Sequence, residues 1–205
     1  MSVGFHPIRL VSWSAALALV IAAPPQLKAQ RDDARWQHRC EQEYGDRDQE
    51  RFCEVRRLGF RPSGRALQFE PDENGGIEIT GWDRDSVDIR ARIQTGARTE
   101  AAAAELARGV RIEISGGKVR VSGPESGRRE HWGVVLVVQA PRQSDIQAAT
   151  TNGPLSVEGV TGDLDLEATN GPVSLSRVAG DVRARVQNGP LSVVLDGSSW
   201  KGKGL

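Results

Sequence analysis

Residues 145–198 read DIQAATTNGPLSVEGVTG, DLDLEATNGPVSLSRVAG and DVRARVQNGPLSVVLDGS, three consecutive copies of 18 residues without an insertion. The opening Asp, the Asn-Gly-Pro triplet and the Ser two places after Pro are identical in all three copies. Self-similarity at a fixed period is the signature of a repeat architecture. The prediction of the fold therefore starts from this stretch.

Each copy contains two short segments in which apolar and polar residues alternate, for example 164–166 and 173–175 in the second copy. Alternation with a period of two is typical of strands that bury one face. Asn-Gly between the segments favours a tight turn, because both residues tolerate a positive φ. The dipeptides Gly162-Asp163 and Gly180-Asp181 mark a second turn.

Two architectures fit this pattern: an antiparallel meander linked by hairpins, and a solenoid in which each copy is one coil stacked on the previous coil. Stacking requires coils of constant length, whereas hairpins tolerate variation in their loops. The period without insertions therefore favours the solenoid.

Weaker forms of the same pattern precede the repeats. The segment 74–79 (NGGIEI) matches a turn followed by a strand, 117–121 (GKVRV) matches its second half, and 87–93 (VDIRARI) alternates cleanly. The longer apolar run 132–139 (WGVVLVVQ) is expected to be a strand buried on both sides. Between these strands, 99–108 (TEAAAAELAR) predicts one short helix, capped by Thr99 and ended by Gly109.

The composition agrees with a β protein and narrows the class of partner. Glycine accounts for 23 of 205 residues, which disfavours a helical bundle because each internal glycine costs a helix about 1 kcal/mol. Lys and Arg (27) balance Asp and Glu (27), so the formal net charge is zero. We therefore expect no nucleic-acid partner and no polybasic attachment to a membrane surface.

The first 29 residues have the layout of a secretory signal peptide. Arg9 precedes the apolar run 10–23 (LVSWSAALALVIAA), and small Ala29 is the expected cleavage position. The alternative is an uncleaved anchor, although the run is shorter than the roughly 20 residues of a membrane span. No later run reaches that length, so we expect an exported chain in the periplasm, on the cell surface or outside the cell, without an integral membrane segment after cleavage.

Residues 30–64 form a charged extension that contains both cysteines of the chain. Export permits a disulfide, and the sequence predicts one between Cys40 and Cys53. A bridge that closes so short a loop contributes about 3 kcal/mol in the chain-entropy model. The alternative is a metal site with His38, which provides only three ligands and lacks the spacing of a zinc finger.

Residues 65–200 resemble the bacterial putative-adhesin family, a group of exported β-strand-repeat domains of unknown function. The resemblance rests on the segment 74–79, the Gly81-Trp82 pair, Gln-Ala-Pro at 139–141 and the tandem Asn-Gly strands. It implies an all-β domain over 65–205: a right-handed, mainly parallel β-solenoid with coils of about 18 residues. It implies no catalytic residues. In the family, a segment like 200–205 leads into further coils, which leaves two alternatives: the last coil lacks its cap, or the domain is truncated at its C-terminus.

Equivalent positions of the three copies are expected to stack. Asn side chains would form a hydrogen-bonded ladder beside turn glycines, and Asp residues would stabilise the second turn. A column of Asp could alternatively hold Ca²⁺. These ladder and turn positions are Asn152, Gly153, Asn170, Gly171, Asn188, Gly189, Asp145, Asp163 and Asp181.

The sequence contains no pattern of a catalytic site. Ser156, Ser174 and Ser192 form a column without a histidine in the repeats, and His131 beside Trp132 fits the start of a strand better than a recognition pair. We therefore expect a non-catalytic envelope scaffold that needs no cofactor or metal, with an envelope protein or a surface glycan as partner. The alternatives are an envelope-stress sensor that binds a peptide or lipid, and a carbohydrate-active enzyme.

Overall fold

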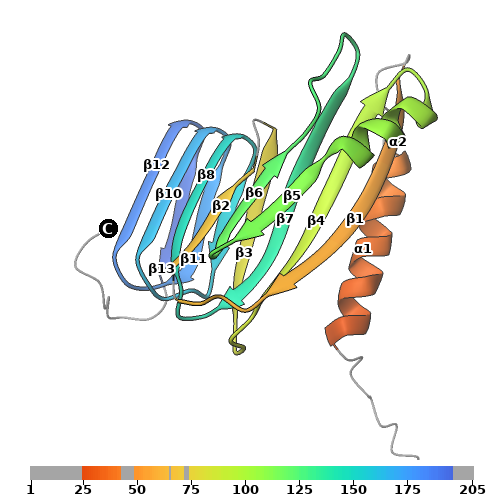
Figure 1. The fold of residues 1–205 in the computed structure, drawn as a ribbon. Coiled ribbons are helices and arrows are strands. Elements are labelled where there is room, and N and C mark those ends of the chain that lie inside the picture. The colour runs from red at the N-terminus through yellow and green to blue at the C-terminus, as the bar shows by residue number, and fades with distance from the viewer. Residues whose placement is uncertain (1–24, 43–48, 65, 72–73, 196–205) are drawn as a thin grey trace, which may run out of the picture.

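The computed structural model describes residues 25–42, 49–64, 66–71 and 74–195, and most of the predicted signal peptide and the segment 200–205 lie outside them. Thirteen strands and two helices are described, and the strands form two sheets that face each other (Figure 1). Neither described helix has the length and hydropathy of a membrane span.

The larger sheet, sheet A, has seven strands, and the smaller one, sheet B, has six. In spatial order, sheet A contains β1 (Glu50–Phe60), β4 (Val87–Ala97), β7 (His131–Pro141), β3 (Gly75–Trp82), β9 (Leu155–Glu158), β11 (Val173–Val178) and β13 (Leu191–Leu195). In the same order, sheet B contains β12 (Val182–Asn188), β10 (Leu164–Asn170), β8 (Asp145–Asn152), β2 (Ala66–Glu70), β6 (Lys118–Ser122) and β5 (Arg111–Ser115). The helices are α1 (Pro25–Gln42) and α2 (Glu100–Gly109).

The predicted right-handed, mainly parallel β-solenoid with one short helix is wrong. The chain is mostly β, but it forms two sheets of mixed orientation rather than a closed solenoid, and it has a second helix. Strand β4 pairs antiparallel with β1 and with β7, and β5 pairs antiparallel with β6. The prediction failed because the 18-residue period is confined to the three copies, and the antiparallel strands that precede them do not share it.

Within the three copies, each 18-residue unit gives one strand to each sheet. Leu164 in β10 pairs in parallel with Ile146 in β8 and with Val182 in β12. Val173 in β11 pairs in the same way with Leu155 in β9 and with Leu191 in β13. The repeats therefore form the end of the molecule where both sheets are parallel (Figure 1).

The hydrophobic core lies between the two sheets. The alternating residues predicted to point inward are buried there, for example Leu164, Leu166 and Leu175. The run 132–139 is buried on one face only, because Val134, Leu136 and Val138 face the core while Val135 and Val137 are half-buried on the other side. That outer face of sheet A is partly covered by α1.

Helix α2 confirms the predicted short helix. Thr99 is its N-cap, and its hydroxyl accepts a hydrogen bond from the Ala102 amide at 3.2 Å. Ala103 and Ala107 are buried against β1 and β4. The Arg56 guanidinium donates to the Ala107 carbonyl at 2.6 Å, and this carbonyl also accepts a hydrogen bond from the Val110 amide at 3.1 Å, so Arg56 adds a second donor and a positive charge at the helix C-terminus.

The stack of repeats ends at β12 and β13, which are the outermost strands of their sheets. Leu191 and Val194 of β13 are 47% and 59% exposed, whereas Val173, which is opposite Leu191 on β11, is buried. The last unit therefore presents part of an apolar core and two strand edges.

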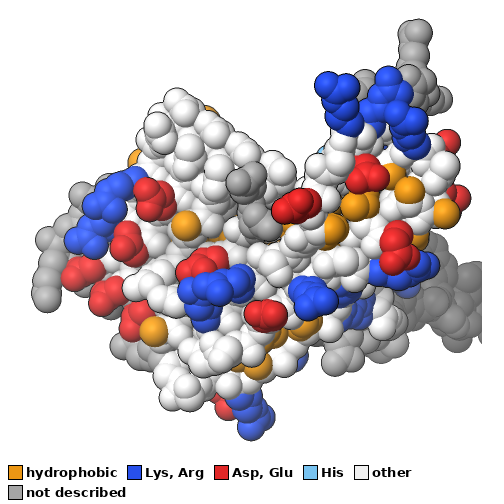
Figure 2. Space-filling model, turned by 45° about the horizontal axis from the view of Figure 1, so that its top comes forward, with side chains coloured by type: hydrophobic (Ala, Val, Ile, Leu, Met, Phe, Trp, Pro, Cys, Tyr) orange, Lys and Arg blue, Asp and Glu red, His pale blue; other side chains and the backbone are white. Residues whose placement is uncertain are grey.

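Acidic and basic side chains are interspersed over the face shown in Figure 2. On sheet B, the Glu70 carboxylate contacts Lys118 Nζ at 2.6 Å and Arg120 at 3.3 Å. The hydrogen bond from Lys118 is the main reason why the pKa of Glu70 lies below its usual value.

Glu70→Gln is expected to lower the free energy of unfolding at pH 7 by only about 0.5 kcal/mol, because the ion pair is solvated. The folded-state pKa is depressed, so the stabilisation is present at neutral pH and is lost as the pH falls through that pKa. Denaturant titrations at pH 7 and pH 3 should show a difference between wild type and variant at pH 7 that shrinks at pH 3. A difference that grows toward pH 3 would contradict the assignment.

Candidate binding groove

Helix α1 is fixed to the outer face of sheet A by three kinds of contact. The predicted disulfide is present, with the Cα atoms of Cys40 and Cys53 6.3 Å apart, so neither thiol is free to bind the metal considered above. Asp33 accepts hydrogen bonds from Arg57 at 2.8 Å and from Arg90 at 3.2 Å. The Trp36 ring lies 5.7 Å from the guanidinium carbon of Arg92.

Asp33 is expected to be the main polar contact of α1. It is 5% exposed, and removing its carboxylate would leave Arg90, whose side chain is 15% exposed, without its partner. We expect Asp33→Ala to cost about 2 kcal/mol, with Glu41→Ala on the exposed side of α1 as a neutral control. Hydrogen exchange of residues 29–42 would measure this loss, and equal exchange in both variants would contradict it.

A cavity of about 920 Å³ lies between α1 and the outer face of sheet A. We call it the α1 groove. Its residues come from α1, β3, β4 and β7: Asp32, Ala34, Arg35, His38, Arg39, Glu78, Thr80, Arg90, Arg92 and Val137. Its volume is within the range of ligand pockets, about 300–1,000 Å³.

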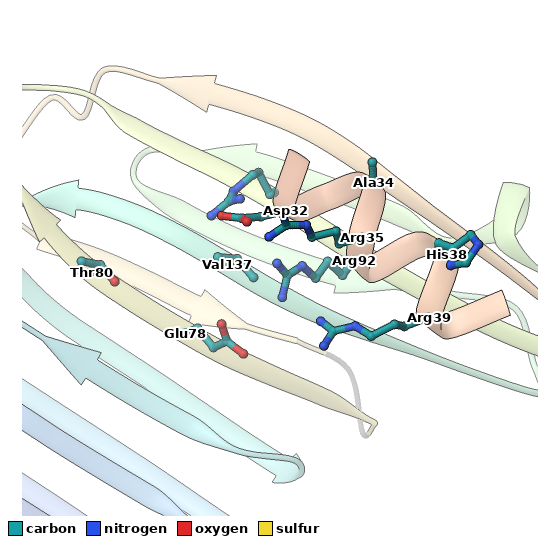
Figure 3. Close-up of a pocket in the computed structure, with 10 residues that line it drawn as sticks. Asp32, Ala34, Arg35, His38, Arg39, Glu78, Thr80, Arg92 and Val137 are labelled. Atoms are coloured by element: carbon teal, nitrogen blue, oxygen red, sulfur yellow. The ribbon is translucent and has the colours of Figure 1, made fainter. Parts of the chain in front are cut away.

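Three guanidinium groups of the α1 groove form no ion pair with the residues that the structure describes: those of Arg35, Arg39 and Arg92. Figure 3 shows the side chains of Arg35 and Arg39, from α1, and of Arg92, from β4, extending into the space between helix and sheet. The Nε of Arg92 is buried and has no hydrogen-bond partner among the described residues.

The floor of the α1 groove continues as a straight row across sheet A. Arg90 on β4 is opposite Val137 on β7, and Val137 is opposite Glu78 on β3. The row continues from Glu78 to Ser156 on β9, Ser174 on β11 and Ser192 on β13. The predicted serine column is therefore in register with the arginine groove.

The predicted Asn positions lie together along one edge of the repeats. Asn170 donates from Nδ2 to Asn152 Oδ1 at 2.9 Å, and Asn188 donates to Asn170 Oδ1 at the same distance. Asn152 in turn donates to Asn74 Oδ1 at 3.3 Å, so the ladder includes the earlier Asn-Gly segment. These side chains are exposed, which makes the ladder a surface feature.

Asn170→Ala removes two amide–amide hydrogen bonds from that ladder. Because water can satisfy the exposed groups that remain, we expect a loss of only about 1 kcal/mol, at the low end of the 1–3 kcal/mol typical of buried polar groups. Thermal unfolding should show a correspondingly small decrease in Tm. A loss above about 3 kcal/mol would mean that the ladder is a main contact between the repeat units.

The remaining predicted turn positions stack in the same way. The Asp145 carboxylate accepts a hydrogen bond at 3.1 Å from the backbone amide of Asp163, which is one unit further along the chain. Asp181 follows Gly180 in the equivalent turn of the third unit. Each ladder asparagine is followed by a glycine: Gly153, Gly171 and Gly189. These glycines are closely stacked, because a Cβ on Gly171 would lie 2.2 Å from the Gly153 carbonyl oxygen. Among the described residues, no group of three His, Cys, Asp or Glu is arranged to hold a metal ion.

The arginines of the α1 groove were not among the site residues predicted from the sequence. Arg35 and Arg39 are spaced i, i+4 and so share one face of a helix, and Arg90 and Arg92 alternate with the buried residues of β4. Both spacings were visible, but only the fold brings the two pairs together. His131, by contrast, packs its ring against Gly96 at the start of β7 and does not line the α1 groove.

Comparison with known proteins gives only weak structural likenesses. No family model and no curated protein matches the chain. A putative cell adhesion protein from Clostridium sporogenes shares 8% identity at a TM-score of 0.35, over 71% of this chain and 100% of that one. A putative lipid binding protein from Parabacteroides distasonis shares 12% identity at a TM-score of 0.37, over 69% and 62%. A putative adhesin from Bacteroides fragilis shares 11% at 0.27, over 74% and 95%. At these values the likeness carries no argument about function.

Proposed function

We propose that the protein is an exported, non-catalytic binding scaffold whose α1 groove captures an anionic partner in the cell envelope. The observation that carries this proposal is the convergence of Arg35, Arg39 and Arg92, three guanidinium groups without ion-pair partners among the described residues. Guanidinium is permanently charged and binds carboxylate or phosphate with a planar pair of donors.

The disulfide supports export. Structural disulfides persist in oxidising compartments and are rare in the cytosol. If cleavage follows Ala29, the mature chain keeps residues 30–42 of α1, which include every α1 residue of the groove. Removal of the predicted signal peptide would therefore leave the α1 groove complete.

The chemistry of the α1 groove favours binding over catalysis. Arginine cannot act as a general base because it does not lose its proton in proteins. Among the described groove residues, no hydrogen-bonded pair of nucleophile and base is present, which is the arrangement that acyl transfer requires.

The test compares charge reversal in the α1 groove with the same change on the opposite sheet. Arg35→Glu/Arg39→Glu is expected to reduce binding of the oxidised protein to isolated cell envelopes at least tenfold, measured by sedimentation. Arg183→Glu/Arg185→Glu on β12 of sheet B is the matched control and should bind as wild type. Equal binding by both variants would refute the proposal.

A further inference from the structure

We propose that the α1 groove and the serine row beyond it form one track for a linear acidic polysaccharide. Carboxylates of the sugar chain bind Arg35, Arg39 and Arg92, and its hydroxyls contact Ser156, Ser174 and Ser192. This inference rests on the proposed function and specifies the chemistry of its ligand.

The track is straight and has a defined length. Ser156 is directly opposite Glu78 at the groove floor, and the next two serines follow in register on successive strands. Neighbouring strands lie about 4.8 Å apart, so the row extends about 14 Å beyond Glu78. A ligand that occupies groove and row must therefore be extended and must cross the strands.

The serine row has the functional groups that bind a sugar. A hydroxyl offers one donor and two acceptor sites, the same set as a sugar hydroxyl. Ser174 and Ser192 are exposed and Ser156 is half-buried, and none of the three side chains is hydrogen-bonded to a described residue. The equivalent row on sheet B is instead charged, with Asp165 opposite Arg183.

The charges of the α1 groove favour an anion of low charge density. Asp32 and Glu78 line it together with the arginines, and they would repel a ligand with a phosphate on every unit. Glu78 and Thr80 can instead accept and donate hydrogen bonds to hydroxyls between carboxylates. From Glu78 to Ser192 the row contains no apolar side chain, so this part of the track offers no apolar contact to an acyl chain.

Calorimetric titration with galacturonic acid oligomers tests the track. The hexamer is expected to bind the oxidised protein, and its fully methyl-esterified form, which has the same sugar without charge, should bind at least tenfold more weakly. Arg35→Gln/Arg39→Gln should weaken hexamer binding at least tenfold, whereas Arg183→Gln/Arg185→Gln on sheet B should leave it unchanged.

The serine row is tested by the length of the ligand. Ser156→Ala/Ser174→Ala/Ser192→Ala should weaken hexamer binding about fivefold and leave dimer binding unchanged, because the dimer fits within the α1 groove. These side chains are at the surface, and an unchanged Tm will show that the variant folds.

Several results would overturn this inference. The first is binding of the methyl ester as tight as that of the charged hexamer. The second is hexamer binding by the serine variant as tight as by wild type. The third is displacement of the bound hexamer by inorganic phosphate at equal concentration. If no oligomer binds while capture by cell envelopes still depends on Arg35 and Arg39, the polysaccharide is wrong and the proposed function stands. If that dependence is also absent, both fail.

Discussion

Gly171→Ala is expected to destabilise the repeat region by about 3 kcal/mol, the largest effect of any single methyl group considered for this chain. A Cβ at this position would lie 2.2 Å from the Gly153 carbonyl oxygen and 2.8 Å from its carbon. Both atoms belong to the backbone of the neighbouring unit, so no side chain can move aside. Relief requires the two units to separate, and overpacking of this kind typically costs 1–3 kcal/mol or more.

The separation would also weaken backbone hydrogen bonds on both sides of Gly171. The Gly153 amide donates to the Asn170 carbonyl, and the Gly171 amide donates to the Asn188 carbonyl, both at 3.0 Å. Gly64→Ala is the matched control, because nothing lies within 4 Å of a Cβ there. Thermal unfolding should show a Tm about 6–12 °C lower for Gly171→Ala and little change for Gly64→Ala. Equal Tm values would show that the units are not in such close contact.

Loss of the disulfide is expected to have the second largest effect, the release of α1 and with it the loss of the α1 groove. In the chain-entropy model a bridge across this loop is worth about 3 kcal/mol. Without it, α1 depends on Asp33 with its two arginines and on the contact of Trp36 with Arg92. Salt bridges that are partly exposed, such as Asp33–Arg57, contribute little by themselves.

Cys40→Ser/Cys53→Ser should therefore be cut by trypsin at Arg31, Arg35 and Arg39 at least tenfold faster than wild type, while cleavage in β7–β11 remains slow. Reduction of the wild-type protein should reproduce the variant, and the same reductant should not change the variant further. The sedimentation assay should show a parallel loss of binding to cell envelopes. Trypsin resistance of α1 in the reduced protein would contradict this account.

Local patterns predicted the parts of the fold that depend on neighbouring residues. Alternation located the strands of the three units, and Thr99 located the start of α2. The spacing of Cys40 and Cys53, in a chain expected to be exported, predicted the disulfide. In each case the determining residues are close in sequence, so propensity and spacing contain the information.

Local patterns did not predict the antiparallel part of sheet A or the α1 groove. Glu50 pairs with Ala97, and Asp88 pairs with Gln139. No sequence pattern between the paired residues indicates which strands are neighbours or in which direction they run. The arginines of the groove meet only because α1 packs beside β1 and contacts β4, which are tertiary contacts between distant segments.

The position of the α1 groove relative to the repeats has a consequence for how the gene can change. The groove is built on α1, β4, β7 and β3, whereas each 18-residue unit adds its strands at the far side of both sheets. An in-frame duplication of one unit would extend the serine row by one strand and leave the arginines in place. Duplication of a unit can thus lengthen the binding surface in descendants of this chain without any change in the residues of the α1 groove.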